Sequence, residues 1–489
     1  MSSPPVSSTT PKSDPSQADS HESRPPRRPS SMTPLLRRLH FYAGILVAPF
    51  LIVATVTGAM YAVAPTLENL AYRGYLHADA AGPAKSVAAQ VQAARRVLPD
   101  LTPTAVQPGI DGATTRVLFD DPSLGESYRW SVFIDPATAT SQGALQVYGS
   151  SGALPMRAWI DQLHRNSHLG EPGRVYSELA ASWLWVIALG GLALWINRFR
   201  KQRRAGRDTR LLSVDRSRSA STPGARLART VNWHGAVGIW LVVGLVFLSA
   251  TGLTWSKFAG ENVTDLRSAL NWNAPSVSTT LGHEHHGVPM DTSSAAPPEA
   301  FSPEALSTTI SRLDAVVATA RSAGLHGVVE VSIPADSATA YRVQQSREPW
   351  VFSRDVVAVD GASNTVVDVA RFADWPFVAK LAEWGIQLHM GILFGVVSQL
   401  GLLALCIALL TVIVRGYVMW WRRRPRRGTA PLGPPPPAGA WRAAPYPAMA
   451  GVVVTAAVVG WFVPLLGVTL VGFLMFDAGL RSVSRLRHR

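Results

Sequence analysis

The chain has 489 residues, of which 47% are hydrophobic and 16% are charged, with a formal net charge of +14 and a mean hydropathy of +0.13. This composition differs from that of ordinary soluble domains and indicates an integral membrane protein. The arginines lie beside apolar segments rather than among aromatic residues, so the positive charge indicates membrane topology and disfavours nucleic acid as a partner.

In chain order, apolar spans alternate with polar regions. A tail rich in Ser, Pro and Thr begins the chain and is expected to be disordered. Arginines at its end, and eleven Lys or Arg residues from Arg198 to Arg229, place the N-terminus and a later loop in the cytoplasm by the positive-inside rule. The predicted divisions are a tail (1–33), a first span (34–65), a first extracytoplasmic module (66–160), a second span with its preceding histidine segment (161–199), a basic cytoplasmic loop (200–229), a third span (230–256), a second extracytoplasmic module (257–378), a fourth span (379–424), a Pro-rich linker (425–444) and a C-terminal membrane hairpin (445–480).

The apolar parts of the spans are predicted from runs of hydrophobic residues. The first runs from about Leu39 to Ala64 and is expected to end at Pro65, and the fourth extends from about Trp384 to Trp421. The C-terminal apolar segment is too long for one relaxed span and contains Pro464, so we predict two short helices and six crossings in all. A single tilted fifth span is the alternative.

The two polar regions each combine a helical pattern with alternating strand patterns. FID-PATATSQGALQV and AVD-GASNTVVDV have the same pattern of a hydrophobic residue, Asp, a turn and a second strand. The predicted fold class is therefore an integral membrane α-helical bundle, with a duplicated four-helix core, a C-terminal helical hairpin and two extracytoplasmic α+β modules.

The spans also repeat. In the first, His40 is followed by Gly44 and Thr57-Gly58, and in the third His234 is followed by Gly238 and Thr251-Gly252 at the same offset. On one continuous helix these positions share a narrow stripe. An ionisable group inside a bilayer usually has a partner, and glycine allows a flat group to approach the backbone.

The second and fourth spans share a further motif. His168 and His389 both begin H-x-G, with Ser-Glu or Ser-Gln and Leu following nine residues later. His164 competes with His168 for this alignment, because Gln-Leu-His occurs at both His164 and His389. If the stretch is helical, His164 and His168 share a face, and the sequence does not separate them.

Topology sorts these histidines by depth. His40 and His234 begin outward-going spans and lie near the cytoplasmic face, whereas His164, His168 and His389 precede inward-going spans. Two bis-histidine sites follow, and two b-type haems held between facing helices would form an electron path across the bilayer. Covalent c-type haem is excluded, because the chain has one cysteine, Cys406. Zinc, structural hydrogen bonding, or a single haem with the remaining histidines structural are the alternatives.

Other motifs are weaker or absent. His283, His285 and His286 in GHEHHG are candidate ligands for a transition metal, although the surrounding Gly, Ser and Pro residues provide no rigid geometry. No Ser-His-Asp arrangement, Walker loop or dinucleotide fingerprint is evident. Hydrolysis and ATP-driven transport are therefore disfavoured, and electrons from a nicotinamide or flavin would need another protein to deliver them.

Four segments resemble the PepSY-associated transmembrane helix family, the PiuB-like iron-regulated membrane proteins that include ferric-siderophore reductases. They are LRRLHFYAGILVAPF, LHRNSHLGEPGRVYSELAASWLW, NWHGAVG and GIQLHMGILFG, in the expected order over about residues 34–425. By position, His40, His164, His234 and His389 match the family's histidine motifs. His168 matches only the variant with a second histidine.

The resemblance implies a membrane haem oxidoreductase for iron uptake in the cell membrane, with PepSY modules outside and b-type haem inside. It would transfer electrons from an unidentified cytoplasmic or membrane donor to a ferric siderophore or another ferric chelate. The competing hypothesis is a haem-free PepSY scaffold or sensor that binds a peptide, a protease or a metal.

Overall fold

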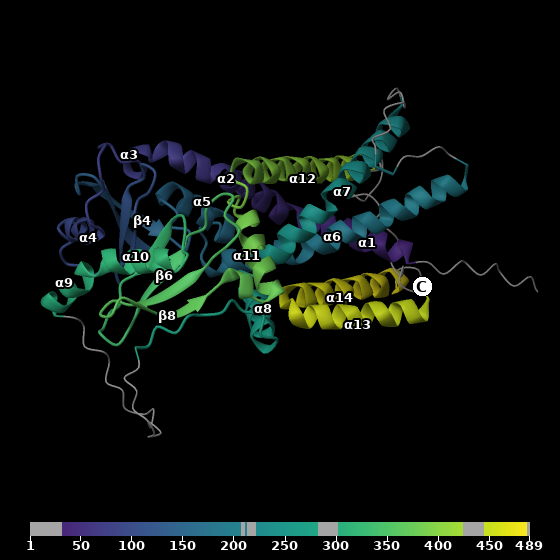
Figure 1. The fold of residues 1–489 in the computed structure, drawn as a ribbon. Coiled ribbons are helices and arrows are strands. Elements are labelled where there is room, and N and C mark those ends of the chain that lie inside the picture. The colour runs from purple at the N-terminus through teal and green to yellow at the C-terminus, as the bar shows by residue number, and fades with distance from the viewer. Residues whose placement is uncertain (1–31, 207–210, 213–221, 282–301, 424–444, 487–489) are drawn as a thin grey trace, which may run out of the picture.

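The computed structural model describes residues 32–206, 211–212, 222–281, 302–423 and 445–486. A helical bundle forms one part of the molecule, and a sheet covered by short helices forms the other (Figure 1). We call the bundle end beside the sheet the sheet end and the opposite end the distal end. The helices are α1 (Thr33–Leu46), α2 (Ala48–Ala71), α3 (Arg73–Leu76), α4 (Val87–Arg95), α5 (Pro155–Asn166), α6 (Glu171–Arg204), α7 (Pro223–Leu253), α8 (Phe258–Ala269), α9 (Pro303–Ser311), α10 (Leu313–Ser322), α11 (Phe377–His389), α12 (Val396–Arg422), α13 (Tyr446–Phe462) and α14 (Pro464–Leu486), with a 3-10 turn η1 (Phe372–Asp374).

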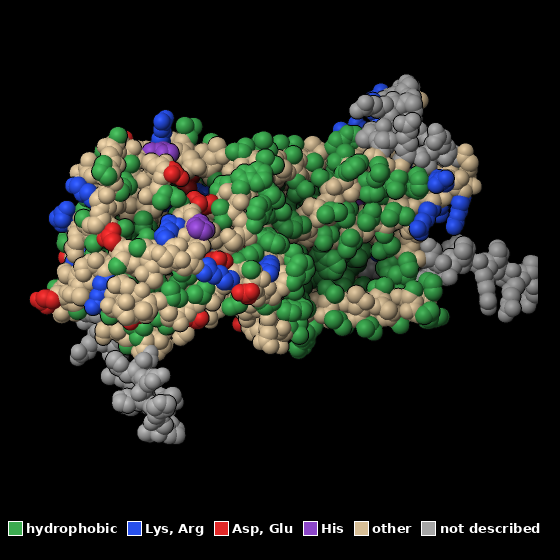
Figure 2. Space-filling model, in the orientation of Figure 1, with side chains coloured by type: hydrophobic (Ala, Val, Ile, Leu, Met, Phe, Trp, Pro, Cys, Tyr) green, Lys and Arg blue, Asp and Glu red, His purple; other side chains and the backbone are tan. Residues whose placement is uncertain are grey.

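Four of the described helices, α2, α6, α7 and α12, are long and apolar enough to cross a membrane. On the face shown in Figure 2, hydrophobic side chains cover most of the bundle, whereas charged side chains gather on the sheet part and at the distal end. Lipid is the environment that accepts such an apolar band. The chain is therefore a membrane protein with a helical bundle.

The eight strands of the described residues form one antiparallel sheet, although the sequence predicts two separate modules. The strand order is β4-β3-β2-β1-β5-β6-β7-β8, and the two halves meet where Ala105 pairs with Ser332 and Val106 pairs with Val331. The two similar hairpins of the sequence become β3–β4 and β7–β8 at opposite edges. The strands are β1 (Pro103–Gln107), β2 (Thr115–Phe119), β3 (Tyr128–Ile134), β4 (Ser141–Tyr148), β5 (Val329–Ser332), β6 (Tyr341–Gln345), β7 (Val356–Asp360) and β8 (Thr365–Ala370).

One hydrophobic core holds both halves of the sheet together. Val91 of α4 and Val316 of α10 are fully buried in the same cluster as Val106 and Val331 from the central strands. The carboxylate of Asp314, at the start of α10, accepts hydrogen bonds from the Val87 and Ala88 amides of α4 at 2.7 and 3.1 Å. These contacts join the two halves in sequence into one folded unit.

The first predicted span differs from the structure in two ways. Its helix breaks at Val47, so His40 lies on α1 and Gly58 on α2, where Pro49 occupies the first turn, a position that tolerates proline. Pro65 does not end the helix as predicted, because α2 continues to Ala71. Proline removes one hydrogen bond there, and the buried Glu68 in the following turn holds the helix by accepting from the Leu154 amide at 2.7 Å.

The predicted fourth span is two helices, α11 and α12. Gly391, just after α11, has φ +73°, and Gly395, just before α12, has φ +54°. Positive φ values favour glycine, and such a residue after a helix ends it. The expected break at Pro464 is the boundary between α13 and α14. The apolar parts of these two helices are shorter than the four spans, and α14 packs on α6, where the Trp183 indole donates to Thr469 Oγ1 at 2.9 Å.

Candidate functional site

Two of the predicted histidines face each other toward the distal end of the bundle. The rings of His40 on α1 and His234 on α7 have centroids 6.4 Å apart and planes at 79°. His40 Nδ1 lies 3.1 Å from the Ile187 carbonyl oxygen, and His234 Nδ1 lies 3.0 Å from the Val412 carbonyl oxygen. We call His40 and His234 the distal pair.

Two further histidines lie near the sheet end, His164 on α5 and His389 on α11. His164 Nδ1 is 2.9 Å from Thr57 Oγ1, and His389 Nδ1 is 2.6 Å from Thr251 Oγ1. Both threonines come from the Thr-Gly dipeptides of the two repeated spans. We call His164 and His389 the sheet-end pair.

The hydrogen bonds fix the same tautomer in all four rings. A carbonyl oxygen can only accept, so Nδ1 of His40 and His234 carries the proton. Thr57 and Thr251 donate their own protons to the Val53 and Phe247 carbonyls at 2.8 Å, so their hydroxyls accept from the histidines. Each Nε2 is left with its lone pair, which is the arrangement of histidines that bind metals through Nε2.

The sheet-end pair lines one cavity of about 400 Å³ inside the bundle. Its walls are largely apolar and come from α2, α6, α7 and α12, including Leu51, Leu184 and Leu402. Its charged lining consists of Arg165, Arg174 and Arg347 together with the carboxylates of Asp161 and Glu178. An apolar cavity with a few convergent polar groups is typical of a cofactor site.

Small residues lie against the histidine rings. A Cβ added to Gly58 would come within 3.2 Å of His164 Cε1, and one added to Gly191 within 3.0 Å of His40 Cε1. The sequence placed Gly58 on one stripe with His40, but Gly58 packs against the sheet-end pair instead. His40 and Gly58, which are the two ends of the first repeated motif, thus lie at different histidine pairs.

The remaining predicted ligands lie elsewhere. His168 is exposed and stacks on Trp159, with centroids 5.0 Å apart, so the structure places His164 rather than His168 at the cavity with His389. His283, His285 and His286 fall outside the described residues. Within the part of the chain that the structure describes, no group of three or more His, Cys, Asp or Glu side chains could hold a metal ion.

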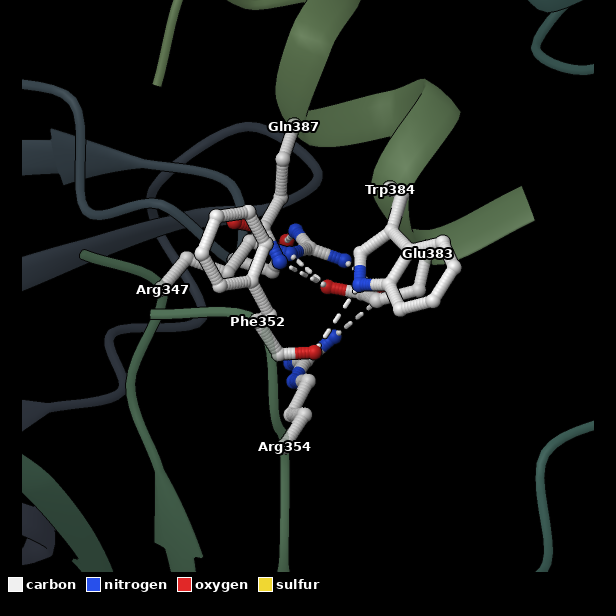
Figure 3. Close-up of polar contacts among 7 residues, drawn as sticks. Arg347, Phe352, Arg354, Glu383, Trp384 and Gln387 are labelled. Atoms are coloured by element: carbon white, nitrogen blue, oxygen red, sulfur yellow. Dashed lines mark hydrogen bonds and ion pairs between the residues drawn. The ribbon is translucent and has the colours of Figure 1, made fainter. Parts of the chain in front are cut away.

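An ion-pair network beside the cavity joins α11 to the sheet (Figure 3). Arg347, in the loop after β6, donates to both carboxylate oxygens of Glu383 on α11 at 2.6 and 2.9 Å, and Arg354 donates to Glu383 at 3.2 Å. Burial alone would raise the pKa of Glu383, but the hydrogen bond and charge of Arg347 outweigh it and lower that pKa. Glu383 is therefore ionised and holds the helix that carries His389.

The Thr-Gly dipeptides are visible in the sequence, but nothing there shows that Thr57 and Thr251 accept hydrogen bonds from histidines. The available signal is that both dipeptides repeat at one offset from a histidine. Arg347 and Glu383 carried no signal in the sequence. They are 36 residues apart and meet only because the sheet folds against α11.

The bundle, its apolar surface and the sheet at one end define a polytopic membrane protein with paired, half-buried histidines. Residues 37–423 match the family described as the PepSY-associated TM region, and the chain belongs to this family. No curated protein sequence matches the chain.

Proposed function

We propose that the chain binds two b-type haems, one at each histidine pair, and transfers single electrons across the membrane to a ferric chelate. The observation that carries the proposal is the pairing of four histidines whose Nδ1 atoms are all engaged and whose Nε2 atoms are all available. Neutral imidazoles on facing helices are how bundles hold haem iron.

The distal pair and the sheet-end cavity are each compatible with this group. The two rings of the distal pair have centroids 6.4 Å apart, close enough for both imidazoles to hold one iron. At the sheet-end pair, the apolar cavity fits a macrocycle, and its arginines are suited to pair with carboxylate groups. Zinc fits less well, because it usually has at least three protein ligands.

The equivalent contacts at the two sheet-end histidines support the duplicated core that the sequence predicts. Thr57 holds His164 as Thr251 holds His389. The two pairs lie at different depths of the bundle. On α7, His234 and Thr251, which contacts His389, are 17 residues apart, about 25 Å along the helix axis.

When bound, haem would supply one-electron chemistry. The chain's own residues hold the rings, exclude water with apolar walls and set the charge beside the cavity. By the positive-inside rule, we place the distal end and the N-terminus on the cytoplasmic side of the cell membrane. An unidentified cytoplasmic or membrane donor would then deliver electrons at the distal pair.

The substrate side is proposed to be the sheet end. A second cavity of about 470 Å³ lies between sheet and bundle. Arginines outnumber glutamates in its lining: Arg129 and Arg157 pair with Glu330 and Glu68, and further cations come from Arg116 and Arg347. These cations would attract an anionic chelate such as a ferric siderophore. One electron converts Fe(III) to Fe(II), which hard oxygen ligands hold less tightly, so iron is released.

The test is a reduced-minus-oxidised visible spectrum with haem stoichiometry on the detergent-purified chain. We expect about two b-type haems in the wild type. His40→Ala and His234→Ala should each lose the distal haem, whereas His164→Ala and His389→Ala should each lose the other. The purified protein should then reduce a ferric hydroxamate when a chemical reductant is supplied.

His168→Ala is the matched control, because His168 lies four residues from His164 but is exposed, and it should keep both haems. A wild type that stays colourless after haem supplementation would refute the proposal and favour the haem-free scaffold. Loss of haem in His168→Ala alone would overturn the assignment of His164.

A further inference from the structure

A third cavity, of about 330 Å³, lies between α8, the β6–β7 part of the sheet and α11. Three basic side chains line it, Arg267 from α8, Arg342 from β6 and Arg354 from the loop before β7, together with the indole of Trp375. Of the described residues that line it, only Glu383 is acidic, and Glu383 is already paired with Arg347 and Arg354.

The donors around this cavity are not satisfied within the described protein. Nε of Arg267, Nε of Arg354 and Nε1 of Trp375 are buried and have no hydrogen-bond partner there. Trp375 is only 7% exposed. Buried polar groups are normally paired, and a donor left alone in a protein interior is costly. Three such donors around one cavity indicate a missing acceptor.

The electrostatics indicate the same kind of ligand. Burial and the neighbouring Arg347 lower the pKa of Arg354, and burial lowers that of Arg342. An anion between these guanidinium groups would relieve both effects, because it supplies opposite charge and accepts several hydrogen bonds at once. Guanidinium groups match carboxylate and phosphate oxygens in geometry as well as charge.

We propose that this cavity binds a phosphate or carboxylate oxyanion through Arg267, Arg342, Arg354 and Trp375. The ligand would join α8, which follows α7 and its Thr251, to α11, which carries His389. Occupancy would therefore stabilise the elements that hold one sheet-end histidine. The site stands whether or not the histidine pairs bind haem.

The ligand has two possible sources, a soluble oxyanion or the headgroup of an anionic lipid. The full chain is placed in nanodiscs of zwitterionic phosphatidylcholine and titrated with inorganic phosphate or citrate, with calorimetry and the melting temperature as readouts. We expect saturable binding and a melting temperature raised by about 2 °C or more. The second arm replaces part of the lipid by phosphatidylglycerol without added anion.

Two variants test the residues. Arg267→Gln should weaken binding about tenfold, because it removes a charged donor, and Trp375→Phe should weaken it about threefold, because it removes one neutral N–H and keeps the ring. Arg96→Gln removes an exposed charge from the sheet part and should bind as the wild type does.

Stabilisation by phosphate or citrate that Arg267→Gln weakens supports the proposal with a soluble ligand. Stabilisation only by phosphatidylglycerol, again weakened in Arg267→Gln, supports it with a lipid headgroup as the source. Absence of any response in both arms overturns it, as does a response that is equal in Arg267→Gln, Trp375→Phe and Arg96→Gln.

Discussion

Gly190 and Gly191 are neighbours on α6, but only Gly191 is closely packed against His40. A Cβ at Gly191 would lie 3.0 Å from His40 Cε1, whereas one at Gly190 would lie 3.9 Å from His40 Nδ1, an ordinary contact. We therefore predict that Gly191→Ala displaces the His40 ring and weakens the proposed haem binding at the distal pair by about tenfold, a typical effect of disturbing the groups around a metal ligand.

The haem content and the redox titration of the purified variants measure this effect, and Gly190→Ala is the control. Alanine is favoured over glycine in helices by about 0.5–1 kcal/mol, so a loss in Gly191→Ala cannot come from helix propensity. Equal haem retention in the two variants would show that the His40 ring has room to move.

The choice between His164 and His168 shows what the sequence lacked at the scale of residues. Their spacing predicts a shared face only if the helix continues through both. It ends at Asn166, and Ser167 and His168 have φ values of +53° and +55°. A left-handed residue turns the chain out of the helix, so four residues no longer make one turn. Single-residue backbone reversals of this kind are not encoded in hydrophobic periodicity.

At the scale of elements, the side chain of Glu178 on α6 caps the N-terminus of another helix, α8. Its two carboxylate oxygens accept from the Phe258 and Ala259 amides at the start of α8, at 3.0 and 2.9 Å, and its side chain is 2% exposed. An acidic group at a helix N-terminus satisfies free amides and complements the helix dipole. We predict that Glu178→Ala destabilises the protein by about 2 kcal/mol.

Unfolding of the detergent-solubilised chain measures that loss, and Glu171→Ala is the control. Glu171 lies on the same helix and pairs with Lys257, but its side chain is 57% exposed, and an exposed pair contributes about 0–1 kcal/mol. A loss in Glu171→Ala as large as that in Glu178→Ala would contradict the capping role.

Hydrophobic patterns predict the apolar segments but not the points within them at which one helix ends and the next begins. The first and fourth predicted spans are each two helices, broken at Val47 and between Gly391 and Gly395. A run of apolar residues continues across such breaks, because the bundle interior and the membrane select for the same side chains. Distance along the helix axis, rather than the break near Val47, assigns His40 and Thr57-Gly58 to different histidine pairs, because His234 and Thr251-Gly252 divide in the same way on the unbroken α7.

At the scale of the whole molecule, the sequence predicts the helices and strands of the two polar regions but not that their strands form one sheet. Their helical and strand patterns correspond to α4, β2–β4, α9, α10 and β5–β8 in the structure. Besides the shared core, two residue pairs between β1 and β5, more than 200 positions apart, join the halves of the sheet. Pairing between distant strands leaves no local signal, because each strand alternates in the same way whichever neighbour it has.

Because the two halves belong to one sheet, we predict that they lose stability together. Asp314 in the second half satisfies two amides of α4 in the first half, and both helices contribute to one core. Asp314→Ala should therefore cost about 1–2 kcal/mol and increase hydrogen exchange in α4, more than 200 residues from the substitution. Exchange measured by mass spectrometry on the full chain tests this. The control is Glu304→Ala, because Glu304 is an exposed acidic residue in the first turn of α9.

Faster exchange confined to α10 would mean that the halves open independently. Faster exchange in both α4 and α10 would mean that the sheet unfolds as one cooperative unit, because the core between its halves is continuous.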